Sequence, residues 1–125
     1  MGLEYLNDMR TALLKEAKEK AEKEFKEVSP TKLRTYYNEV LALKEKLVHS
    51  PNDESLWCKF YLLSAKVSYD TKRKVNKRPL VNEYFKNFIQ EAVKTISERR
   101  DISLLEKFCL FFEAVVGFFP RSTSN

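Results

Sequence analysis

Glycine is almost missing from this chain of 125 residues, since it occurs only at Gly2 and Gly117. A strand-rich fold of this size normally needs glycine in its hairpin turns and bulges, where the backbone takes positive φ. The glycine-rich loops that cradle the phosphates of nucleotides need it as well. The sequence therefore predicts an all-α fold, and it excludes a nucleotide-binding loop of that kind.

Apolar residues recur at helical spacing in five segments, which predicts a single bundle-like domain of five helices over residues 1–125. The first segment is expected to be one long charged helix from Leu3 to about Val28. Its apolar stripe is narrow, as in many helices that pack on a partner. Ser29-Pro30 is expected to cap and start the second helix, and Ser50-Pro51-Asn52-Asp53 the third. Asp53-Glu54 is expected to serve the start of that third helix.

The third helix is expected to end near Arg73 or Lys74, and residues 75–79 are expected to form a connecting loop. The fourth helix follows Pro79. The fifth is capped by Asp101 or by a Ser103–Glu106 capping box. Residues 120–125 are expected to form a frayed tail.

The net charge of the chain is concentrated in the segment Lys66–Arg78. The whole chain has 23 Lys and Arg against 18 Asp and Glu, a net charge of +5. The segment alone has six cations and one acid, Asp70, so it also has a net charge of +5. Such a localised charge on an otherwise balanced protein is typical of a polyanion site, most simply nucleic acid. The alternative is a solvated loop whose lysines only aid solubility.

Residues that could support catalysis are scarce. His49 is the only histidine and lies near a predicted helix end, so a Ser-His-Asp site, a Cys-His site or a paired-histidine metal site is not expected. Cys58 and Cys109 are expected to be reduced core residues. The sequence predicts no enzyme activity, no cofactor and no metal. No apolar run approaches the ~20 residues of a membrane span, and no signal-peptide pattern is present, so a cytoplasmic protein is expected.

The candidate phosphate contacts are the cations of the basic segment together with one arginine from the second helix. They are Arg34, Lys66, Lys72, Arg73, Lys74, Lys77 and Arg78. Arg34 could equally be a surface or core-lid residue, and Lys32 and Lys59 are weaker candidates. Tyr69 could stack on a base or could cap the core beneath the basic segment.

Two stretches resemble the small subunits of type III-A CRISPR (Csm) effector complexes. Residues 29–40 read SPTKLRTYYNEV, similar to the motif that opens the family's helical core: a cap, a leucine, an arginine, an aromatic pair and a valine. Residues 63–73 read LSAKVSYDTKR, similar to the later segment in which a lysine precedes a tyrosine and an arginine. Residues 108–119 resemble the C-terminal helix. The resemblance thus covers a family-like core of about residues 29–119, whereas residues 3–28 are the least family-like part.

One departure from the family pattern is the stretch between Tyr69 and Arg73, where the family often has small residues. This chain has Asp70, Thr71 and Lys72. Asp70 could weaken a phosphate contact, or it could orient Arg73 by pairing with it.

The resemblance implies a non-catalytic subunit that stacks in several copies along an effector filament in antiviral defence. Such a subunit would contact the guide RNA, the target RNA and other subunits. Contacts to backbone phosphates would make binding independent of RNA sequence. The alternative is a helical protein-interaction adaptor without RNA binding, whose long N-terminal helix binds a partner helix and whose basic loop meets an acidic protein surface. A dimer through the Leu3–Val28 stripe is also consistent with the sequence.

Overall fold

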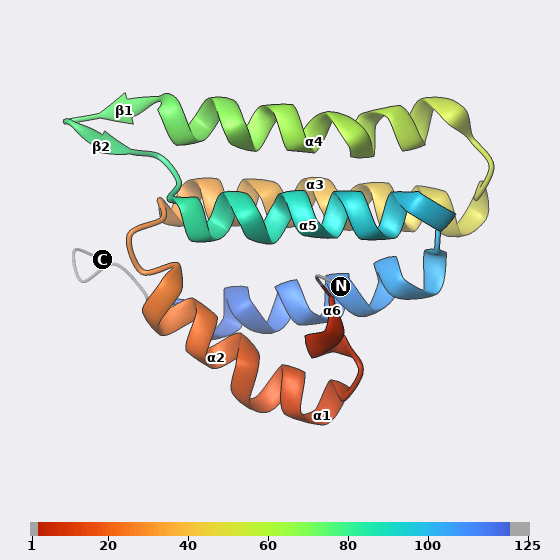
Figure 1. Cartoon of the computed structure of the whole chain (residues 1–125), viewed down its shortest axis with the longest axis horizontal. Coiled ribbons are helices and arrows are strands. Elements are labelled where there is room, and N and C mark those ends of the chain that lie inside the picture. The colour runs from red at the N-terminus through yellow and green to blue at the C-terminus, as the bar shows by residue number, and fades with distance from the viewer. Residues whose placement is uncertain (1–2, 121–125) are drawn as a thin grey trace.

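The computed structural model describes residues 3–120, and their core is a bundle of four long helices (Figure 1). The helices are α3 (Pro30–His49), α4 (Glu54–Lys72), α5 (Glu83–Arg99) and α6 (Ile102–Phe118). Each long helix runs opposite to the one before it, with α4 packed along α5 and α3 packed along α6. With a shorter N-terminal helix these make five, so the all-α prediction is confirmed.

The N-terminal segment is not the single long helix that the sequence predicted. A short 3₁₀ turn, η1 (Glu4–Leu6), comes first, and the helix begins at Met9 because the Asp8 carboxylate accepts a hydrogen bond from the backbone N–H of Thr11 (3.3 Å). From there the helix alternates between α-helical and π-helical turns. Its parts are α1 (Met9–Thr11), η2 (Ala12–Glu16), α2 (Ala17–Glu19) and η3 (Lys20–Glu24).

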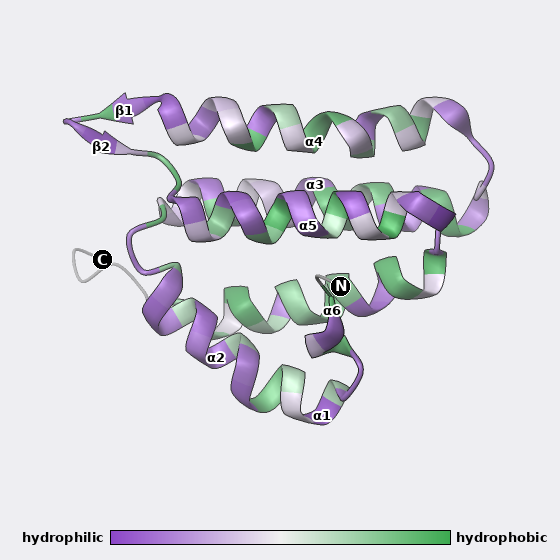
Figure 2. Cartoon of the chain, viewed as in Figure 1, coloured by the Kyte–Doolittle hydropathy of each residue, from purple (hydrophilic) through white to green (hydrophobic). Residues whose placement is uncertain are grey.

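The N-terminal helix packs against α6 of its own chain. Ala12, Ala17 and Ala21 are completely buried, and their small side chains let the two backbones approach closely. Hydrophilic residues dominate the rest of this helix (Figure 2). The apolar stripe therefore packs on its own domain, which was one of the two arrangements open to it.

The helix starts follow the sequence closely. Ser29 caps α3 by accepting a hydrogen bond from the Lys32 N–H (3.3 Å), and Asp101 caps α6 by accepting one from the Leu104 N–H (3.0 Å). The cap of α4 is Asp53 rather than Ser50, because the Asp53 carboxylate accepts hydrogen bonds from two backbone amides of the first turn. Ser50 instead follows the last residue of α3.

Aromatic rings fill the core between α5 and α6. The Phe88 ring lies 5.0–6.0 Å, centroid to centroid, from five other phenylalanine rings. Cys109 is buried as expected, but Cys58 is exposed, so its predicted core position is wrong. Across residues 3–120, no helix has both the length and the apolar character needed to span a membrane.

Candidate nucleic-acid interface

The basic segment ends in a β-hairpin rather than in the expected loop. Strand β1 (Lys74–Val75) pairs antiparallel with β2 (Arg78–Pro79). The two residues between them, Asn76 and Lys77, have φ of 55° and 68°. This is the left-handed pair of a tight hairpin turn, in which the second position is usually glycine. The scarcity of glycine therefore did not exclude a hairpin here, because asparagine and lysine take the positive φ instead.

The basic hairpin, defined as residues 72–79, extends past the end of the helical bundle (Figure 1). Every residue in it is exposed, including its five cations Lys72, Arg73, Lys74, Lys77 and Arg78. Within residues 3–120 none of these five forms a salt bridge, although the chain forms several elsewhere. The structure thus gathers five of the seven predicted phosphate contacts on one exposed projection.

Tyr69 lies beside the base of this hairpin, on the last turns of α4. Its side chain is 61% exposed, and the Arg73 guanidinium carbon lies 5.8 Å from the centre of its ring. The interpretation that Tyr69 caps the core is therefore wrong. An exposed ring next to an arginine is an arrangement on which a nucleic-acid base can stack.

The remaining two candidates lie apart from the hairpin. Lys66 forms an ion pair with Glu39 of α3, and its ammonium lies 5.6 Å from the centre of the Tyr36 ring. Arg34 is exposed, so the core-lid interpretation is wrong. Lys32 points toward α4, and a residue two positions later on a helix is rotated by about 200°. Arg34 therefore faces away from α4 and from the hairpin.

Asp70 takes neither of the roles suggested by the sequence. It is buried, with 2% of its surface exposed, and points into the bundle rather than toward Arg73. The Tyr36 hydroxyl donates a hydrogen bond to its carboxylate (2.6 Å), and the Lys32 ammonium pairs with the same oxygen (3.3 Å). Burial, and then this bond to a carboxylate, raise the pKa of the Tyr36 phenol well above its usual value. The Lys32 ammonium is therefore held in an ion pair with Asp70.

One cation near the hairpin was missed by the sequence reasoning. Lys26 lines a hollow of about 340 Å³ at the base of the hairpin, together with Ser29, Val75 and Arg78. Backbone hydrogen bonds hold this region together, from the Ser29 N–H to the Leu80 carbonyl (2.9 Å) and from the Leu80 N–H to the Arg73 carbonyl (3.1 Å). Lys26 and Arg78 are 52 positions apart, and no local sequence pattern indicates that they share a hollow.

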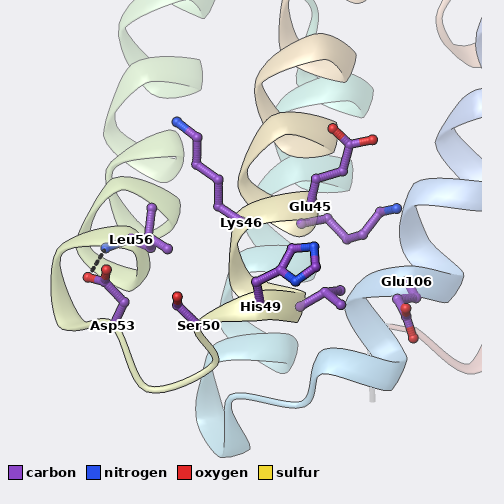
Figure 3. Close-up of a pocket in the computed structure, with 9 residues that line it drawn as sticks. Glu45, Lys46, His49, Ser50, Asp53, Leu56 and Glu106 are labelled. Carbon is purple, nitrogen blue, oxygen red and sulfur yellow. Dashed lines mark hydrogen bonds between the residues drawn. The ribbon is translucent and has the colours of Figure 1, made fainter.

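A larger hollow of about 790 Å³ lies at the opposite end of the bundle and contains His49 (Figure 3). Asp53, one of its lining residues, is occupied in capping α4 through the Leu56 amide. Among the residues that line it, no hydrogen bond joins His49 to Ser50 or Glu106. Over the described part of the chain, no cluster of three His, Cys, Asp or Glu residues could hold a metal ion.

Comparison with known proteins extends the resemblance over almost the whole chain. The family model described as Csm2 Type III-A matches residues 7–123. The match includes the N-terminal helix, which had looked least like the family. No curated protein and no solved structure matches the chain significantly. The chain belongs to the Csm2 Type III-A family, and it is thus a structural subunit of a type III-A CRISPR effector complex.

Proposed function

We propose that this chain binds the sugar–phosphate backbone of guide RNA and target RNA through the basic hairpin, as a non-catalytic subunit in antiviral defence. One observation supports the proposal above all others. The five cations of the hairpin are exposed and lack ionic partners within residues 3–120, while the rest of the chain is balanced in charge. Cations arranged in this way hold a strand by its phosphates without reading its sequence.

The surroundings of the hairpin favour a binding track longer than the hairpin itself. Lys26 adds a cation at its base, and Tyr69 adds an exposed ring beside Arg73. A backbone track with an adjacent stacking ring is a common solution for single-stranded nucleic acid. Arg34 and Lys66 remain candidates for contacts outside the hairpin, and Lys66 would have to leave Glu39 to make one.

The adaptor alternative loses its main surface in this structure. That surface was the N-terminal helix, whose apolar stripe is buried against α6. The adaptor's second surface, the basic segment facing an acidic protein, stays exposed. Contacts with other subunits of the complex would instead use apolar side chains that stay exposed, such as Leu62 on α4 (64% exposed) and Leu110 on α6 (51% exposed). Both residues lie on the helices rather than in the hairpin, so protein contacts and RNA binding can coexist.

The test is fluorescence anisotropy of a labelled single-stranded RNA, titrated with the protein over a series of salt concentrations. Wild-type protein should show a log affinity that falls with log salt by about 0.7 for each phosphate contact. The double variant Arg73→Gln/Lys74→Gln should bind more weakly, and its slope should be shallower by about 1.4. Far-UV circular dichroism should be unchanged, because both side chains are exposed.

The matched control is Lys94→Gln/Lys107→Gln. It removes the same charge from exposed positions near the other end of the bundle, with no salt bridge at either residue in the described chain. Equal affinities and equal salt slopes for the two double variants would contradict the hairpin as the RNA site. Tight binding to other subunits with no measurable affinity for RNA would support the adaptor instead.

A further inference from the structure

Asp70 is the one buried charged side chain in residues 3–120, and the contacts described so far give it no role in binding. It lies on the last turn of α4, three residues before Arg73. Both of its partners, Lys32 and Tyr36, lie on the first two turns of α3. The contact therefore joins the end of one helix to the start of another at the point where the basic hairpin leaves the bundle.

We propose that Asp70 is a positioning residue that sets the direction of the basic hairpin by fastening the end of α4 to the start of α3. This inference rests on the proposed function, since it assigns Asp70 a part in presenting the hairpin to RNA. The hairpin side chains are all exposed. No core packing of their own fixes their direction, which must come from the two chain segments that enter and leave the hairpin.

The segment that leaves the hairpin is already fixed at the residue that caps α3. The Leu80 carbonyl accepts a hydrogen bond from the Ser29 N–H (2.9 Å), and the Leu80 N–H donates to the Arg73 carbonyl (3.1 Å). Asp70 supplies the corresponding side-chain attachment for the segment that enters. Both attachments reach the start of α3, so this one helix end holds both the segment that enters the hairpin and the segment that leaves it.

The chemistry of the contact suits a fixed attachment. A buried carboxylate is strongly disfavoured unless it is paired and hydrogen-bonded, so this arrangement keeps its partners in place. The phenol and the ammonium approach the same carboxylate oxygen from one helix. Hydrogen bonds to a charged group are stronger than those between neutral groups.

The proposal can be tested because it predicts an effect opposite to that of charge alone. Replacing Asp70 by asparagine removes a negative charge next to the RNA site and frees Lys32 from its ion pair, so electrostatics alone would strengthen binding. A positioning role predicts that Asp70→Asn weakens binding, by about threefold to tenfold at fixed salt, as expected when one or two phosphate contacts are lost. The charge-matched control is Glu98→Gln, an exposed position at the other end of α5.

Amide hydrogen exchange gives a second measurement that does not depend on RNA. Asp70→Asn should accelerate exchange at the Leu80 amide, which bonds to Arg73, while exchange at buried positions of α6 such as Phe112 stays slow. If Asp70 only stabilised the whole fold, its replacement would accelerate exchange at the Leu80 amide and at the buried amides of α6 together. Tyr36→Phe keeps the charge and removes one hydrogen bond, so it should show the same local acceleration even if Asp70→Asn does not fold.

The outcomes separate this inference from the proposed function. Unchanged exchange at Leu80 in both variants, or RNA binding by Asp70→Asn as tight as that of Glu98→Gln, would overturn the positioning role. If wild-type protein bound no RNA, the proposed function would fail by itself, and the exchange data would still decide whether Asp70 holds the hairpin.

Discussion

Replacing Ala21 by leucine should destabilise the protein, because Ala21 lies where the N-terminal helix meets α6. Its side chain is completely buried in η3. Leucine adds three carbon atoms, and protein interiors are packed too densely to accept them without movement. If the helix were instead free to bind a partner, the same substitution would place a leucine on an open surface.

The expected loss in the free energy of unfolding is about 1–3 kcal/mol, the usual cost of adding methylene groups to a packed core. For a chain of this length, each kcal/mol corresponds to about 3–5 °C in the melting temperature. Urea unfolding followed by far-UV circular dichroism measures the free energy directly. The slope of that free energy against urea concentration should not change, because the surface exposed on unfolding stays nearly the same.

The control is Lys23→Leu, two positions further along the same helix, where the side chain is exposed. A substitution there should change the free energy of unfolding by no more than about 0.5 kcal/mol. Equal stabilities for the two variants would refute the packing of the N-terminal helix on α6. A stability of Ala21→Leu that rises with protein concentration would mean that the helix forms an intermolecular contact.

Three further predictions concern stability and reactivity. Gly117→Ala on α6 should stabilise the protein by about 0.5–1 kcal/mol, because a Cβ there meets no atom within 4 Å, and a lower melting temperature in calorimetry would contradict this. A thiol reagent should modify Cys58 quickly in the native protein but Cys109 only after denaturation, since Cys109 is buried and burial raises its pKa to about 12; two fast thiols would contradict it. Burial raises the pKa values of Tyr5 and Tyr36, so above pH ~10 these two phenols ionise only in the unfolded state. The free energy of unfolding should therefore fall above that pH by about 1.4 kcal/mol per pH unit for each of them. Urea unfolding between pH 9 and 11 checks the last point, and Tyr36→Phe should show a shallower decline than wild type.

Local chemistry explains which parts of the fold could be predicted. Ser29 and Asp101 cap helices because a short polar side chain at a helix start binds backbone amides nearby, which the sequence records directly. The periodic apolar residues of the later helices likewise lie in the core. Several adjacent residues before α4 could have served as its cap. The path of the loop decides that Asp53 does so and Ser50 does not.

The N-terminal helix was predicted poorly because its turns are not all α-helical. Ala12, Ala17 and Ala21 are spaced by five and then four residues, a pattern produced by the π-helical turns and not by a repeat of 3.6. Alanine also signals burial only weakly in a sequence. Whether such a stripe packs on its own domain or on a partner depends on the distant surface of α6.

The hairpin and Asp70 show the same limit at the candidate site. The charge of the basic segment could be predicted from the sequence, but its hairpin could not. The reason is that Asn76 and Lys77 take the positive φ that normally identifies glycine. Asp70 looked like one more charge on an exposed segment because its partner Tyr36 is 34 residues earlier in the chain. The inward direction of the Asp70 side chain is decided by the pairing of α3 with α4.

These features separate the proposed binding surface from the parts of the molecule that hold the fold together. The hairpin contributes no buried side chain, so replacing its cations should change RNA affinity while the core remains intact. Asp70 belongs to the core, yet it lies at the base of the hairpin, where a change in packing alters the direction of the cations. Variants of the hairpin therefore measure its charge, and variants of Asp70 and Tyr36 measure its placement. If both kinds of variant weaken RNA binding but only the second accelerates exchange at Leu80, charge and placement are independent requirements of the same site.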